Sequence, residues 1–187
     1  MSAIQSIDES YPVVGVDINA DMDQYLTFIL ADEEYGVDIL RVQEIKGWGS
    51  VTPIPNTPEF IKGVINLRGT IVPIIDLRQR FGLEKTDYGK LTVVIVLNII
   101  CESGERVMGI IVDAVSDVYN VTEEEMKPPP DFGSVAAIDY VKGLATIGEK
   151  MVIVLDIDHL LTSSVYESIH NSARPDLIKG SPELNST

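Results

Sequence analysis

The sequence has a single cysteine, Cys101, and residues 1–39 contain nine acids but no lysine or arginine. One cysteine cannot form an internal disulfide, which is consistent with a reducing compartment. The N-terminus is acidic where a secretory signal would be basic, and the longest apolar run, residues 93–97, is far too short to span a bilayer. We therefore expect a soluble, cytoplasmic protein with no direct membrane insertion.

Positive charge is also scarce, because the 187 residues have a formal net charge of −15. Such a chain is poorly suited to bind nucleic acid or an anionic membrane surface. Residues 40–80 are the exception, since they contain six bases and three acids and have a local net charge of +3. With 45% hydrophobic residues, the chain can bury a core of one domain or of two small lobes.

Signatures of catalysis and of cofactor binding are missing as well. His159 and His170 lack the spacing of metal ligands, and Cys101 lies among glutamates that disfavour a reactive thiolate. Residues 47–49 read Gly-Trp-Gly, without the lysine and the following helix of a phosphate-binding loop. The sequence therefore predicts a protein that is not an enzyme and that has no cofactor and no metal.

Short β-branched and apolar segments, separated by Gly, Asn or charged turns, make up most of the middle of the chain. We expect strands at residues 25–31, 36–40, 64–67, 70–75, 91–99, 107–112, 143–147 and 151–155. The best helix candidate begins at about residue 157. Residues 1–22 and 171–187 are polar or irregular and are expected to be flexible tails. The predicted fold class is mainly β, with a C-terminal helix.

An internal repeat divides this β-structure. Residues 60–77 match residues 140–157 at a shift of 80, and residues 36–45 resemble residues 109–118 at a shift of 73. The positions that coincide in the first pair are Lys62/Lys142, Gly63/Gly143, Val72/Val152 and Asp76/Asp156. The repeat predicts two β-lobes of similar topology, at about residues 23–85 and 90–156.

The repeated aspartates, Asp76 and Asp156, allow two interpretations. They could share a proton as the carboxylates of an aspartic protease do, but neither is followed by the small exposed turn which that chemistry needs. The alternative is that each ends a strand and caps the next helical turn, and Gln79 stands where a capping partner of Asp76 belongs. Capping is the favoured interpretation.

A tight turn, Asn66-Leu67-Arg68-Gly69, joins two apolar segments within the basic stretch. Gly69 allows the turn to form, so we expect a rigid tip at which Arg68 supports nothing internal. An arginine at such a tip is either solvated or available to a partner, with Leu67 as an apolar neighbour.

Four segments identify a family: DEEYGVDILRVQEIKG (32–47), NTPEFIKGVINLRGTIVPIIDLR (56–78), TVVIVLN (92–98) and MGIIVDAVSDV (108–118). They closely resemble the bacterial chemotaxis coupling protein family CheW, and the resemblance covers residues 23–165. It implies two similar five-stranded β-barrels around a shared hydrophobic core. It also implies a non-catalytic adaptor, located at receptor arrays, that couples the cytoplasmic tip of methyl-accepting chemoreceptors to the regulatory domain of the histidine kinase CheA. An adaptor of a non-flagellar pathway, such as type IV pilus motility, would share these features.

The resemblance also assigns residues. It implies CheA binding by Arg68, Leu67 and Glu44, receptor binding by Val42, Val115 and Val118, and a structural or interface role for Gly63 and Gly69. The valines have the spacing of ordinary core residues, so burial is the alternative for each of them. Gly63 is alternatively required only for a bend of the backbone.

Overall fold

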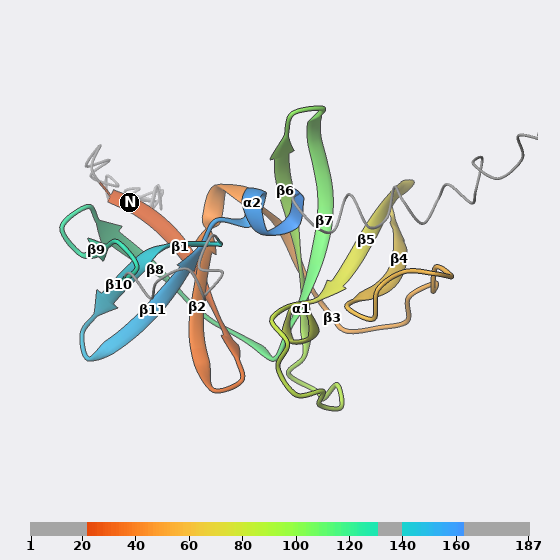
Figure 1. Ribbon diagram of the computed structural model, residues 1–187, viewed down its shortest axis with the longest axis horizontal. Coiled ribbons are helices and arrows are strands. Elements are labelled where there is room, and N and C mark those ends of the chain that lie inside the picture. The colour runs from red at the N-terminus through yellow and green to blue at the C-terminus, as the bar shows by residue number, and fades with distance from the viewer. Residues whose placement is uncertain (1–21, 131–139, 163–187) are drawn as a thin grey trace, which may run out of the picture.

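The computed structural model describes residues 22–130 and 140–162 (Figure 1). Its strands are β1 (Met22–Leu30), β2 (Glu33–Asp38), β3 (Val42–Gly47), β4 (Ile61–Leu67), β5 (Thr70–Asp76), β6 (Val93–Cys101), β7 (Gly104–Val112), β8 (Ala114–Thr122), β9 (Met126–Lys127), β10 (Val141–Ile147) and β11 (Lys150–Leu155). Its helical turns are η1 (Ile39–Arg41), α1 (Leu77–Arg80) and α2 (Ile157–Leu161). The expected C-terminal tail and all of the expected N-terminal tail except Met22 lie outside the described residues.

The strands form two sheets, which confirms the mainly β class. One sheet has six strands in the order β8-β1-β2-β11-β10-β9, and the other has five in the order β3-β6-β7-β5-β4. The structure does not show the expected pair of closed five-stranded barrels. Among the described residues, the end strands β3 and β4 do not pair with each other. An isolated backbone bridge joins Thr52, in the connection between the two strands, to Val64 of β4.

The repeat seen in the sequence is a structural repeat. The β4–β5 hairpin followed by α1 corresponds to the β10–β11 hairpin followed by α2, and in both hairpins the register shifts just before the repeated glycine. The amide of Asp76 donates to the carbonyl oxygen of Phe60 at 2.7 Å, and the amide of Asp156 donates to that of Tyr140 at 2.7 Å. Two copies of one local structure therefore follow from two copies of one sequence.

The sheets nevertheless divide the chain differently from the expected lobes at residues 23–85 and 90–156. After β2 the chain crosses from the six-stranded to the five-stranded sheet, and after β7 it crosses back, so that β8 pairs with β1 (Figure 1). Each sheet therefore combines strands of both repeats. A sequence repeat shows which segments are alike, but it does not show which copy supplies the partner of each strand.

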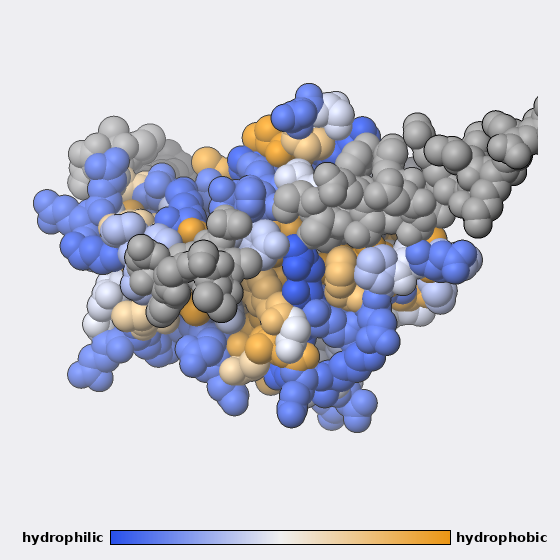
Figure 2. Space-filling view, viewed as in Figure 1, coloured by the Kyte–Doolittle hydropathy of each residue, from blue (hydrophilic) through white to orange (hydrophobic). Residues whose placement is uncertain are grey.

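On the face drawn in Figure 2, hydrophobic residues gather in the middle, over β2 and α1, with hydrophilic residues on both sides. A shallow groove of about 400 Å³ lies here between the two sheets. It is lined by Tyr35, Arg80, Phe81, Tyr140, Val141, Ile153 and Leu155. Arg80 stacks on Tyr140, with its guanidinium carbon 4.9 Å from the ring centre, so the groove has a cationic edge.

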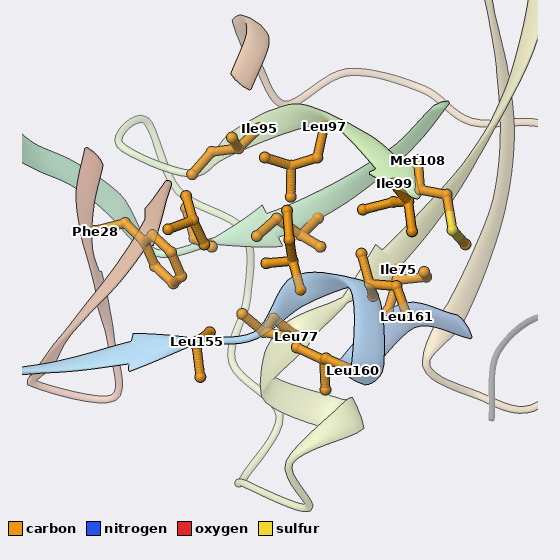
Figure 3. Packing of buried hydrophobic residues seen from close by; sticks show 14 of the residues in the cluster. Phe28, Ile75, Leu77, Ile95, Leu97, Ile99, Met108, Leu155, Leu160 and Leu161 are labelled. Carbon is orange, nitrogen blue, oxygen red and sulfur yellow. The ribbon is translucent and has the colours of Figure 1, made fainter. Parts of the chain in front are cut away.

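The largest core cluster lies between the sheets and draws on both of them (Figure 3). Phe28 and Leu155 come from the six-stranded sheet, Ile75 and Leu97 come from the five-stranded one, and all are buried. The short helix α2 follows a strand of the six-stranded sheet but packs on β6 of the other, where Leu160 is fully buried. This shared core fixes the two sheets against each other, because burying apolar surface stabilises by about 25 cal/mol per Å².

Candidate protein-binding site

The turn between β4 and β5 has the geometry of a two-residue hairpin. Arg68 has a φ of 51° and Gly69 a φ of 88°, as the central residues of a type I′ turn do. The Oδ1 atom of Asn66 accepts a hydrogen bond of 2.8 Å from the amide of Gly69, which holds the loop from within. The tip is therefore set by its own backbone, and Leu67 packs, half-buried, on a small cluster inside the five-stranded sheet.

Arg68 has an internal partner, so the expectation that it supports nothing internal is wrong. Its Nη1 atom lies 2.9 Å from Oε2 of Glu44, which belongs to β3 at the opposite end of the same sheet. The Arg68 side chain is still 80% exposed, whereas that of Glu44 is 23% exposed. Two of the three residues assigned to CheA binding therefore form one ion pair, with the arginine presented to solvent.

Strand β3 presents different side chains on its two faces. Its register with β6 shifts between Val42 and Glu44, after which Ile45 lies opposite Ile95. Val42 and Ile45 consequently lie on the same face of β3, opposite Leu97 and Ile95, and Glu44 lies on the other face, opposite Val96. Val42 packs half-buried against that core, whereas Ile45 remains 43% exposed.

Strand β8 repeats this arrangement in the six-stranded sheet. Val115 pairs with Phe28 and Val118 pairs with Leu26, with a register shift between them. Val115 packs half-buried against the core between the sheets, and Val118 is 43% exposed. We use the name crossover patch for Val42 and Ile45 of the five-stranded sheet together with Val115 and Val118 of the six-stranded sheet, because these residues lie on the two strands that follow the crossings between sheets.

Sequence reasoning missed Ile45, although a signal for it was present. The shift of 73 that aligns residues 36–45 with residues 109–118 aligns Val42 with Val115 and Ile45 with Val118. The structure gives each member of the second pair the same exposed fraction, 43%. The repeat therefore indicated Ile45 as the counterpart of a predicted receptor-binding residue.

An ion pair fastens the first crossing, immediately before β3. The guanidinium of Arg41 donates to both oxygens of Asp158 in α2, with Nη1–Oδ1 3.2 Å and Nη2–Oδ2 2.8 Å. Asp158 also accepts a hydrogen bond of 2.8 Å from the amide of Ile100. Two parallel hydrogen bonds constrain orientation as well as distance, so η1 is tied to α2 and to the end of β6.

The second crossing also has an ion pair to a helix, but here the acid lies at the crossing and the arginine in the helix. Asp113 lies between β7 and β8 and accepts hydrogen bonds of 2.9 Å from Nε and from Nη2 of Arg78 in α1. The amide of Ala31 donates to the same carboxylate at 2.9 Å. Burial on its own would raise the pKa of Asp113, but the hydrogen bonds from Arg78 and Ala31 outweigh it and hold this pKa below the ordinary value. The carboxylate is therefore ionised at neutral pH.

Gly63 is required by the backbone of its own strand. Its φ is +143°, and a β-carbon there would lie 2.1 Å from the carbonyl oxygen of Thr52. No side chain fits at such a distance, since the clash is with the backbone of Thr52, which pairs with Val64 of β4. This contact accounts for Gly63 without a partner. Gly69 has open space around it and is explained by its φ alone.

Both repeated aspartates are helix caps. The Asp76 carboxylate accepts from the amide of Gln79 at 3.2 Å, and that of Asp156 accepts from the amide of His159 at 3.1 Å. The hydroxyl of Tyr88 also donates to Asp76 at 2.5 Å, and burial together with this hydrogen bond raises the pKa of Tyr88. The carboxylates line separate grooves, so they are not the dyad of an aspartic protease.

Within residues 22–130 and 140–162, no three His, Cys, Asp or Glu side chains are grouped so that they could hold a metal ion. No helix in these ranges has the length and apolar character needed to cross a membrane. The arrangement instead offers exposed aliphatic side chains and an ion-paired arginine on rigid strands.

Comparison with known proteins agrees with this description. The CheW-like domain family matches residues 24–165. The chemotaxis protein CheW of Klebsiella aerogenes is 52% identical over 151 residues, which cover 81% of this chain and 89% of that protein. Protein FrzA of Myxococcus xanthus is 28% identical over 75% of this chain and 86% of its own length.

A solved structure supports the same assignment. The crystal structure of the scaffolding protein TtCheW from Thermoanaerobacter tengcongensis matches with a TM-score of 0.68 and 39% sequence identity, covering 76% of this chain and 94% of that chain. The family consists of scaffold or adaptor proteins of chemotaxis, and it is not catalytic. This chain belongs to the CheW-like domain family.

Proposed function

We propose that the protein couples methyl-accepting chemoreceptors to the histidine kinase CheA, as an adaptor in the cytoplasm that is recruited to receptor arrays. Family membership supports a role in chemotaxis, and the separation of two kinds of surface supports coupling. One surface carries the ion pair of Arg68 and Glu44, and the other is the aliphatic crossover patch.

The observation that carries the proposal is that β3 contributes to both surfaces, from its two faces. Ile45 and Val42 lie on one face of β3, and Glu44 between them lies on the other face and binds Arg68. A strand that is hydrogen-bonded to β6 along its length is a rigid connection between the two surfaces. Two partners bound to opposite faces of one strand are held at a fixed distance, which is what an adaptor must achieve.

The CheA surface consists of Arg68, Leu67 and Glu44. Arginine is favoured in interfaces because its planar fork of donors binds carboxylates and stacks on rings. Here Glu44 uses one end of the guanidinium, and the exposed remainder is available to the kinase regulatory domain. Glu44 restricts the positions of a long side chain, which lowers the entropy lost on binding.

The receptor surface is the crossover patch. The tip of a chemoreceptor is a helical hairpin, and amphipathic helices bind by placing aliphatic side chains against an apolar surface. Val118 and Ile45 are the members most available to such a helix, since each is 43% exposed, whereas Val42 and Val115 are half-buried against the core.

Two matched variants test the assignment. Arg68→Ala is expected to weaken binding to the CheA regulatory domain by about 10- to 100-fold and to leave receptor-tip binding unchanged. Val118→Glu places a charge in an apolar contact and is expected to have the reverse effect. Isothermal titration against each purified partner measures both affinities.

Thermal unfolding is the control. An ion pair whose arginine is 80% exposed contributes little stability, and Val118 is 43% exposed, so both variants are expected to melt near the wild-type temperature. If either substitution weakened both partners equally, the two surfaces would not be separate. If Arg68→Ala bound CheA with wild-type affinity, Arg68 would be a solvated turn residue with no role in CheA binding. A CheW-type adaptor of a non-flagellar pathway would use the same surfaces, and recovery of its kinase and receptors from native cells distinguishes the pathways.

A further inference from the structure

The five-stranded sheet has a seam, which we define as the space between its end strands β3 and β4 (Figure 1). The seam is bridged at one end by the ion pair of Arg68 and Glu44 and at the other by the bridge of Thr52 and Val64. Between these bridges lies a groove of about 400 Å³. It is lined by Lys46, Gly47, Trp48, Gly49, Ser50, Val51, Thr52, Val64, Ile65, Asn66 and Val94.

The β4 side of the seam offers backbone hydrogen-bonding groups. The N–H and the C=O of Val64 face away from β5, because both bond to Thr52 at 2.9 Å. Backbone groups alternate in direction along an antiparallel strand, so those of Asn66, two residues further on, face the same way. Asn66 therefore directs one donor and one acceptor into the seam.

The β3 side of the seam offers the backbone hydrogen-bonding groups of two more residues. The amide of Trp48 donates to the carbonyl of Thr92 at 3.1 Å, so Trp48 is directed toward the β6 side of the strand. By the same alternation, Lys46 bonds to β6, and the backbone groups of Gly47 and Ile45 face the seam. Backbone groups that face outward from the edge of a sheet are templates for another strand.

The chemistry of the groove selects among strands. Lys46 is its one ionisable lining residue in the described part of the chain, and no acidic side chain lines it. Trp48, whose ring packs on that of Tyr88 at a tilt of 54° with ring centres 4.5 Å apart, and Ile65 supply apolar contacts. The groove thus suits an extended segment that alternates acidic and apolar side chains.

We propose that the seam binds an extended acidic segment of a partner protein, which adds as a strand between β3 and β4. Main-chain hydrogen bonds to Ile45, Gly47 and Asn66 would hold the segment, and Lys46 would select its charge. This site lies beside the ion pair of Arg68 and Glu44 but uses different groups, so it does not depend on the proposed coupling of receptors to CheA.

The test uses the full chain and two synthetic peptides, acetyl-Glu-Val-Glu-Val-Glu-amide and the same peptide with lysine in place of glutamate. Trp48 is the only tryptophan of the protein, so its fluorescence reports on the groove directly. We expect saturable binding of the acidic peptide and at least tenfold weaker binding of the basic one. Amide exchange measured by NMR should slow at Ile45, Gly47 and Asn66 when the acidic peptide is bound.

Variants at two positions separate the contributions of charge and backbone. Lys46→Glu should reverse the preference between the peptides. Gly47→Pro removes a donor that faces the seam rather than β6, so the fold should persist while acidic-peptide binding is lost. Gly47→Ala is the control and should bind like wild type, since nothing lies within 4 Å of an added β-carbon.

Three results would overturn the proposal. The first is equal binding of both peptides, and the second is binding that leaves the exchange of the three amides unchanged. The third concerns residues 1–21, which contain four acids and no base. The backbone amides of Ile45, Gly47 and Asn66 could already exchange slowly in the free protein and exchange faster once Asp8, Asp17 and Asp21 are replaced by Asn and Glu9 by Gln. In that case the chain's own segment, and not a partner protein, occupies the seam.

Discussion

Replacing Arg78 or Asp113 at the second crossing should lower the free energy of unfolding, and the loss should be larger the more these side chains are buried. The side chains of Arg78 and Asp113 are 16% and 32% exposed. Hydrogen bonds to charged groups contribute about 1.5–3 kcal/mol net, and screening by solvent around a carboxylate that is one-third exposed lowers this. We expect a coupling free energy of about 1–2 kcal/mol between Arg78 and Asp113.

The assay is a double-mutant cycle, with urea unfolding of wild type, Arg78→Gln, Asp113→Asn and the double variant. Two further ion pairs of different exposure serve as comparisons for the coupling free energy. Arg41 and Asp158 are 24% and 29% exposed and should couple about as strongly, whereas Lys85 and Glu59, at 62% and 80%, should show no measurable coupling. Equal coupling free energies in all three pairs would refute the claim that the ion pairs at the crossings stabilise the fold more than exposed pairs do.

The same pair has a predicted pH dependence. The pKa of Asp113 in the folded protein lies below its ordinary value of 3.8, so its stabilising contribution is complete above that value. It is lost as the pH falls through the lower folded pKa. The difference in unfolding free energy between wild type and Asp113→Asn should therefore be constant from pH 7 to about 5 and should shrink below about pH 4. A difference that grows on acidification would contradict the assigned direction.

Gly63→Ala should lower the free energy of unfolding by about 3 kcal/mol or prevent folding, since its β-carbon would meet a carbonyl oxygen at 2.1 Å, whereas Gly69→Ala should cost only about 1 kcal/mol of backbone strain. Thermal denaturation measures both, and equal costs would show that strand β4 can move away from its neighbour. Asp76→Ala should cost more than Asp156→Ala, because both lose a cap of about 1 kcal/mol but only the buried Asp76 also loses a tyrosine hydroxyl. Urea unfolding compares them, and a larger loss for Asp156→Ala would contradict this order.

The hairpins could be predicted from the sequence because their signals are local. The turn at residues 66–69 and its counterpart at residues 146–149 carry glycine where a positive φ is needed, and both hairpins were expected at the positions where they occur. The capping role of Asp76 and Asp156 is equally local, since each binds an amide three residues further on.

The sheet assignment could not be predicted in the same way. Strands β3 and β8 were not among the expected strands, because their faces mix polar and apolar residues and a register shift interrupts the alternation in each. These are the strands that follow the crossings between the sheets. The two lobes contiguous in the sequence were predicted from the repeat, which does not show where the chain changes sheet. The pairing of Arg68 with Glu44 was hidden for a related reason, since β3 and β4 lie at opposite ends of the strand order.

The most direct test of the coupling role is whether one molecule binds both partners at once. Purified chain, CheA regulatory domain and a receptor-tip hairpin are mixed at concentrations above both dissociation constants, and the masses of the complexes are measured by analytical ultracentrifugation. Two surfaces on opposite faces of β3 predict a ternary complex that contains all three components. Displacement of the kinase domain by the receptor tip, or binding of neither partner, would contradict the account.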